Sequence, residues 1–144
     1  MDHLRDSVDM KIIQSSEGNK RQVQFLFNGP TQLTIVLSPN SNYNLTSWSL
    51  LAQVPKSGVP WNDRNTYFIY FGRGNENHQF GFTCEFTKNS GDDDIGDPVV
   101  DVQLVGFFLY GTNMATAEFI DFANRFPSWT DTMIWSAVLK QYTV

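Results

Sequence analysis

The chain has 144 residues and a net charge of −5, and 15% of its residues are aromatic (12 Phe, 5 Tyr and 4 Trp). This length suits one domain, residues 1–144, whose core can fold without disulfide or metal staples. The aromatic content excludes a disordered chain, and Ala, Glu, Lys and Leu do not dominate as in a coiled coil. The acidic balance, with no basic cluster larger than Lys20-Arg21, argues against nucleic acid or anionic lipid as a partner.

The chain offers no segment for direct membrane insertion. No run of 18 apolar residues occurs, and residues 1–6 lack the apolar core of a signal peptide. If the protein enters the secretory pathway, its signal is therefore expected in a longer parent.

The first two predicted strands alternate apolar and polar residues. Val23, Phe25 and Phe27 share one face, and an alternating run over residues 32–38 follows the turn Asn28-Gly29-Pro30. We expect these two strands to pair as a hairpin. Residues 45–51, which include Trp48, form the next predicted strand.

The middle of the chain continues this pattern. A polar connection around Trp61 leads to a predicted strand over residues 66–71, and residues 79–87 alternate in the same way. The last of these strands contains the single cysteine, Cys84, which excludes an intrachain disulfide and a Cys-based zinc site. Since Cys84 lies on the same face as three phenylalanines, we expect it in the core. Residues 88–98 read as a loop and residues 99–110 as a long strand, with a bulge expected at Gly106.

The periodicity becomes helical after residue 111. Phe119, Phe122, Ala123 and Phe126 recur at helical spacing, with Asn113 as a possible cap and Pro127 after the end. We assign this stripe to the core, expect a second short turn within residues 128–135, and expect residues 136–144 to be extended. The predicted fold class is mainly β, an antiparallel β-sandwich of six to eight strands with one amphipathic C-terminal helix.

Two polar clusters are candidate sites of chemistry. The carboxylates Asp92, Asp93, Asp94 and Asp97 could bind calcium, but their spacing does not match an EF-hand, so a solvated loop is favoured. The pair Glu76 and His78 could serve an independent hydrolase or a metal, although a polar hairpin loop explains it equally well. Nucleophile-elbow and P-loop motifs are absent from the sequence. We therefore assign no catalytic residue, no metal ligand and no cofactor to this chain.

Aromatic side chains offer a second kind of site. Trp48, Trp61, Tyr67 and Tyr70 could form a platform for sugar, although most aromatic residues of a sandwich lie in its core. Trp48 and Trp61 are retained as possible ligand-binding residues, and a carbohydrate- or peptide-binding β-sandwich module is the alternative function. Asn44, in Asn44-Leu45-Thr46, is a candidate glycosylation site.

Three stretches of the chain are similar to one known family. They are residues 33–39 with 45–49, residues 59–61 with 66–72, and residues 119–122 with 125–129, where Arg125-Phe126-Pro127-Ser128-Trp129 is the most specific motif. Together they resemble the C-terminal luminal domain of endoplasmic reticulum metallopeptidases of the Felix-ina type, which are multi-spanning zinc peptidases related to aminopeptidase Y. The stretches cover about half of the chain and consist of strand cores and a helix ending, so they indicate a domain rather than a site.

The resemblance implies a non-catalytic accessory domain that is the C-terminal fragment of a larger membrane protein. In the family, the peptidase domain carries the zinc, and none of the family's zinc-binding motifs matches a position here. Zinc is therefore expected in the parent's peptidase domain and not in this chain. The implied partners are that peptidase domain and luminal proteins, and the implied location is the endoplasmic reticulum lumen, as part of a membrane-anchored parent. A luminal location would also make Asn44 accessible for glycosylation.

Overall fold

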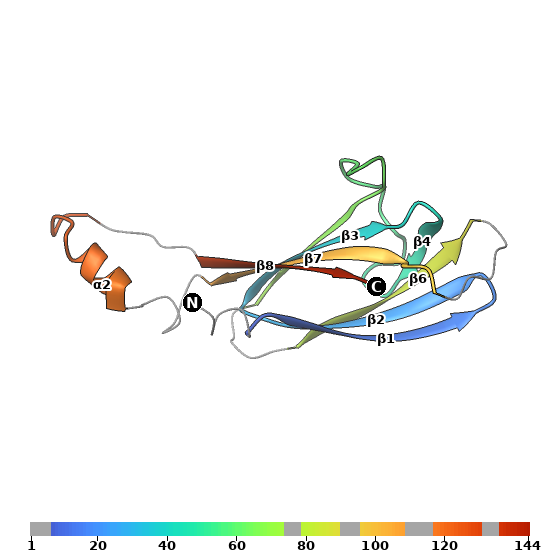
Figure 1. Cartoon of the computed structure of the whole chain (residues 1–144), viewed down its shortest axis with the longest axis horizontal. Helices are drawn as coiled ribbons and strands as arrows, with labels where there is room; N and C mark the ends of the chain where they lie inside the picture. The colour runs from blue at the N-terminus through green and yellow to red at the C-terminus, as the bar shows by residue number, and fades with distance from the viewer. Residues whose placement is uncertain (1–6, 74–78, 90–95, 109–116, 131–135) are drawn as a thin grey trace.

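The computed structural model describes residues 7–73, 79–89, 96–108, 117–130 and 136–144. Its strands form two four-stranded antiparallel sheets, in the orders β1-β2-β6-β4 and β5-β3-β7-β8. Figure 1 shows β7 and β8 in one layer, with β1 and β2 in the other. The strands are β1 (Asp9–Glu17), β2 (Lys20–Asn28), β3 (Gln32–Pro39), β4 (Tyr43–Trp48), β5 (Tyr67–Gly72), β6 (Phe80–Lys88), β7 (Val100–Phe108) and β8 (Ser136–Thr143). This architecture confirms the predicted antiparallel β-sandwich.

The core lies between the two sheets and follows the alternation of the sequence. Phe25 and Phe27 of β2 are fully buried and contact Phe82 of β6, with ring centres 5.3 and 5.6 Å apart. From the opposite sheet, Ile35 and Leu104 are also fully buried. Each such side chain contributes about 1.5–3 kcal/mol to folding when it leaves water, which explains why strand alternation fixes which face turns inward.

The hairpin predicted from β2 and β3 is wrong. β2 pairs with β1 and β6, whereas β3 pairs with β5 and β7 in the other sheet. The turn around Pro30 therefore carries the chain from one sheet to the other. Alternation shows which side chains share a face, and it carries no information on which strand lies alongside.

The strand β1 was not predicted, because its sequence lacks alternation. Among the described strands it pairs with β2 alone, as an edge strand, and most of its side chains are exposed, including Ile13. The turn into β2 uses Gly18, whose φ of +59° falls in the left-handed region that favours glycine.

Gly106 makes no bulge, contrary to the prediction. Its register is unbroken, opposite Leu33 of β3 and Val138 of β8. A Cβ atom at this position would lie 2.7 Å from Val8 Cγ2 and 2.9 Å from Pro30 Cδ, so glycine is needed for close packing. The register shift of the sandwich lies instead in β4, between Leu45 and Ser47.

The C-terminal elements are only partly as expected. The helix α2 (Ala117–Ala123) and the strand β8 exist, but no residue of α2 is buried, and Phe122 and Phe126 are exposed. The assignment of the helical stripe to the core is therefore wrong, and Figure 1 shows α2 apart from the two sheets. Residues 128–130 form a turn in which Thr130 N donates to Pro127 O at 3.0 Å, while Asn113 and residues 131–135 lie outside the described residues.

In the described part of the chain, no helix is long and apolar enough to cross a membrane.

Candidate functional site

The two tryptophans retained as possible ligand contacts have different environments. Trp48 is only 8% exposed and packs edge-on against Tyr67 in the core, with ring centres 6.2 Å apart. Its indole N–H has no hydrogen-bond partner among the described residues. Trp61 is 44% exposed. Of the pair, only Trp61 presents its ring to a ligand from outside.

Trp61 lies at the tip of the connection between β4 and β5. Asn62 and Asp63 have φ values of 50° and 59°, and two consecutive left-handed residues make the tight turn typical of β-hairpins. Around this turn, Trp61 and Arg64 exchange backbone hydrogen bonds of 3.1 and 3.0 Å. The turn therefore holds both side chains next to each other.

Arg64 fixes this turn to the sheet. Its Nη2 lies 2.7 Å from Asp101 Oδ2 on β7, and its guanidinium carbon lies 5.0 Å from the centre of the Trp61 ring. Thr143 Oγ1 of β8 donates to the other carboxylate oxygen of Asp101 at 2.8 Å. A second anchor is the hydrogen bond from Ser38 Oγ to Asn65 O, at 3.2 Å. We call residues 58–66 the Trp61 loop.

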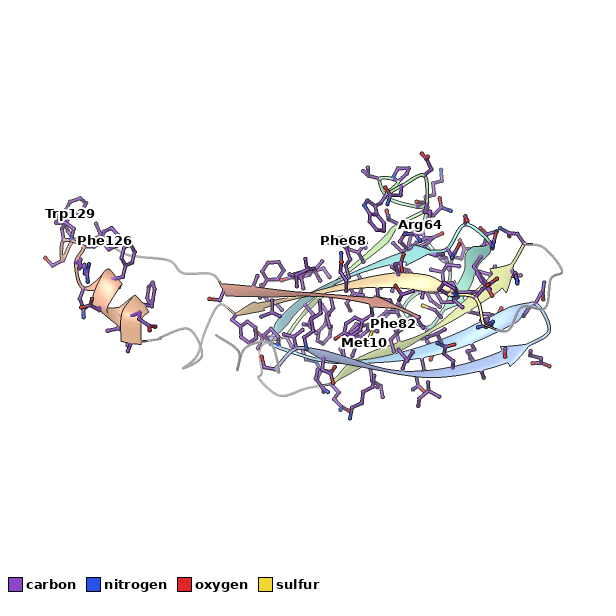
Figure 2. The ribbon with its side chains drawn as sticks, in the orientation of Figure 1. Met10, Arg64, Phe68, Phe82, Phe126 and Trp129 are labelled. Atoms are coloured by element: carbon purple, nitrogen blue, oxygen red, sulfur yellow. The ribbon has the colours of Figure 1, made fainter. Side chains whose placement is uncertain are left out.

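A groove of about 650 Å³ lies between the Trp61 loop and the outer face of the sheet β5-β3-β7-β8. The lining residues come from the loop and from all four strands: Val36, Ser38, Gly58, Val59, Trp61, Thr66, Phe68, Asp101, Val102, Gln103, Gln141, Tyr142 and Thr143. Figure 2 shows Arg64 and Phe68 on one side of the sandwich, away from Phe82, which lies between the sheets.

The floor of the groove is one row of side chains across the sheet. The register pairs Val36 with Phe68 and with Gln103, and pairs Gln103 with Gln141. Adjacent strands lie about 4.8 Å apart, so this row spans roughly 14 Å. It changes from aromatic at β5, where Phe68 is 66% exposed, to amide at β7 and β8.

Most of this groove could not be predicted from the sequence. Gln103, Gln141 and Phe68 carry no motif and lie far apart in the chain, and strand pairing brings them into one row. Arg64 is held beside the groove by its ion pair with Asp101. Of the expected aromatic platform, Tyr67 is buried, and Tyr70 is exposed on β5 but does not line the groove. The sequence feature that could have indicated the groove is the alternation of polar residues in β7, which puts Asp101 and Gln103 on the outer face.

Cys84 is buried, as predicted. Burial disfavours the thiolate and raises the pKa of Cys84 to about 12, so the thiol stays protonated at neutral pH. This position is that of a small apolar core residue rather than a nucleophile.

The polar clusters fall mostly outside the described residues. Glu76, His78 and Asp92–Asp94 lie there, while Asp97 pairs with Lys88 at 3.5 Å. Within the described ranges, no group of three or more His, Cys, Asp or Glu side chains is placed to hold a metal ion.

Asn44 and Thr46 lie together on the outer face of the other sheet. Both are exposed and flank the buried Leu45, so the two residues that define the glycosylation triplet lie on the surface of β4. Asn44 Nδ2 donates to Asn89 Oδ1 at 2.6 Å, and Thr46 Oγ1 lies 3.0 Å from Thr87 Oγ1. Attachment of a glycan to Asn44 remains a prediction.

A second exposed surface lies at the far end of the molecule from the Trp61 loop, on and after α2 (Figure 2). We call it the α2 surface, and it consists of Ile120, Phe122, Phe126 and Trp129. All four side chains are exposed, and Trp129 is the most open at 83%. Phe122 and Phe126 contact each other edge to face at 5.1 Å. Helical spacing produces such a stripe whether it packs inside its own domain or against a partner, which explains the wrong assignment to the core.

A family model for the C-terminal domain of endoplasmic reticulum metallopeptidase 1 matches residues 2–142. The chain belongs to this family. Comparisons with curated proteins and with solved structures gave no match. The match confirms the resemblance inferred from the three stretches and extends it to almost the whole chain. The family is named for the C-terminal domain of a metallopeptidase of the endoplasmic reticulum.

Proposed function

We propose that this domain is a non-catalytic accessory domain that packs on the peptidase domain of its own parent chain, in the endoplasmic reticulum lumen. The family match supports a C-terminal position next to metallopeptidase machinery. In this proposal the parent is anchored in the membrane and hydrolyses peptides, its zinc is held by the peptidase domain, and the sandwich supplies no catalytic group.

The observation that carries the proposal is the α2 surface. Four large apolar side chains of one short segment are exposed together, while no residue of α2 is buried. Exposed apolar clusters of this kind mark interaction sites, because each Å² of apolar surface that leaves water contributes about 25 cal/mol. The nearest partner in a multidomain chain is another domain of the same chain, since the tether keeps its effective concentration high.

The charges near the α2 surface fit a protein partner. Arg125 and Asp121, the charged pair beside Phe122, bind each other at 2.6 Å. With Glu118 in the first turn of α2, the rim of the surface is polar and slightly acidic around an apolar centre, and a polar rim is typical of interfaces between proteins.

Crosslinking in the full-length parent tests this proposal. A photoreactive residue at Phe126 should crosslink to the peptidase domain, whereas the same residue at Ile13, an exposed apolar position on β1, should not. Equal crosslinking from both positions, or products from Phe126 that contain no peptidase-domain peptide, would contradict docking through α2. The isolated chain should also show no aminopeptidase activity, and about one tightly bound zinc ion per chain would overturn the non-catalytic role.

A further inference from the structure

Two amide side chains, those of Gln103 and Gln141, line the groove under the Trp61 loop. Gln103 and Gln141 face each other on neighbouring strands, and neither side chain has a hydrogen bond among the described residues. Each amide offers two N–H donors and a carbonyl acceptor. A ligand rich in hydroxyl groups could use both kinds of group on both amides.

Aromatic rings accompany these amides. Trp61 borders the groove from the loop, and Phe68 lies in the same floor row as Gln103 and Gln141. Such rings present flat apolar faces, on which the C–H face of a sugar ring packs while its hydroxyls reach polar neighbours. The combination of an aromatic face and planar amides therefore fits a carbohydrate.

The charges of the side chains that line the groove favour a neutral ligand. Asp101 is the one charged side chain among the described residues that line it, and both of its oxygens are already bonded, to Arg64 and to Thr143. A phosphate, carboxylate or ammonium group in the groove would be desolvated without a free counter-charge, which is costly.

The backbone under the groove argues against an extended peptide. β3 is paired on both sides, to β5 and β7, and β7 is paired to β3 and β8. A peptide that adds a strand needs a free sheet edge, and the middle of the groove floor, on β3 and β7, has only side chains to offer. The edges of this sheet belong to β5 and β8, at the two ends of the floor row. The volume of about 650 Å³ also lies within the usual range of small-ligand sites.

We propose that this groove is a binding site for a neutral carbohydrate. The rings of Trp61 and Phe68 stack on the sugar, and the amides of Gln103 and Gln141 bind its hydroxyls. Arg64 acts as a positioning residue, because it ties the Trp61 loop to Asp101. The site lies on the sandwich and not on α2, so it goes beyond the proposed accessory role and can fail independently of it.

An NMR titration of the ¹⁵N-labelled 144-residue chain tests the proposal. Three neutral probes are added in turn: a mannose trisaccharide, an N-acetylglucosamine trisaccharide and a glucose trisaccharide. With at least one of them, the indole N–H signal of Trp61 and the side-chain amide signals of Gln103 and Gln141 should shift and saturate at millimolar concentration. No shift at these groups with any of the three would overturn the proposal, as would a larger response to a neutral tetrapeptide.

Matched variants locate the binding. Trp61→Ala and Gln141→Ala should each weaken binding of the responsive trisaccharide roughly tenfold, since each removes a side chain that contacts the sugar. Tyr70→Ala and Leu139→Ala are the controls, because both residues are exposed on β5 and β8 but neither lines the groove. Unchanged affinity in Trp61→Ala, with the amide spectrum showing an intact fold, would place the sugar elsewhere and overturn the assignment.

Discussion

Arg64 of the Trp61 loop and Asp101 of β7 form an ion pair of 2.7 Å that joins a connection between strands to the middle of a sheet. The two residues are 37 positions apart in the chain. Because Arg64 also lies against the Trp61 ring, the pair sets where the indole stands above the groove. The pair is largely shielded, unlike the mostly exposed pair of Asp121 on α2 and Arg125 just after it.

Replacing Arg64 should loosen the Trp61 loop more than it destabilises the protein. Arg64→Ala removes an ion pair and a cation–π contact, so we expect a loss of about 1 kcal/mol in the free energy of unfolding and faster motion of the Trp61 indole by ¹⁵N relaxation. Arg125→Ala, which breaks the exposed pair, should stay within ~0.5 kcal/mol of the wild type. Equal effects of the two variants would show that the Arg64 pair does not anchor the loop.

Alanine substitutions of Phe25 and Phe68 compare how much the inner and outer faces of the strands contribute to folding stability. Phe25 is fully buried between the sheets, whereas Phe68 is mostly exposed on the outer face. We expect Phe25→Ala to cost about 3–5 kcal/mol in urea unfolding, since it leaves a cavity in the core. Phe68→Ala should cost less than about 1 kcal/mol. A large loss for Phe68→Ala would mean that the outer face belongs to the folded core.

Gly106 should not tolerate a methyl group. In Gly106→Ala the new Cβ would meet Val8 and Pro30 at under 3.0 Å, so we expect a loss of about 1–3 kcal/mol by thermal or urea unfolding. Gly96→Ala is the control, because nothing lies within 4 Å of a Cβ at that position. A Gly106→Ala variant as stable as the control would contradict the close approach of these segments.

Cys84 should be unreactive in the folded protein. Its raised pKa and its burial predict no labelling by a water-soluble thiol reagent at pH 8, and full labelling in denaturing urea. The folded thiol has the higher pKa, so its contribution to stability is complete below the ordinary value of 9.0 and is lost as pH rises toward about 12. Between pH 8 and pH 10.5, the wild type should therefore lose more stability than Cys84→Ala. Rapid labelling without urea would contradict the core position.

Asn44 should carry a glycan when the parent is made in the secretory pathway. Because Asn44 and Thr46 are exposed on β4, we expect a shift in electrophoretic mobility that a glycosidase removes and that Asn44→Gln abolishes. Asn89→Gln is the control, because it alters the hydrogen-bond partner of Asn44 and leaves the triplet intact. A mobility that Asn44→Gln does not change would show that the site is unused.

Much of the sandwich could be predicted from alternation alone. Val23, Phe25 and Phe27 turn inward as expected, and so does Cys84, because the free energy of burial selects one face of each strand. The edge strand β1 escaped prediction because a strand with little buried surface needs no alternation. The pairing of β2 and β3 with other strands escaped it because pairing depends on the whole topology.

The sequence by itself determined the β-sandwich class, the inward face of most strands and the membership in the family of endoplasmic reticulum metallopeptidase 1 C-terminal domains. Only the tertiary structure decided that Trp48 is buried while Trp61 is open, that α2 exposes its apolar stripe, and that two distant glutamines meet in one row with Phe68. The physical reason for this division is that the periodicity of a sequence reports which face of its own strand or helix each side chain occupies. Contact between distant residues depends on strand order and register, which local polarity does not encode.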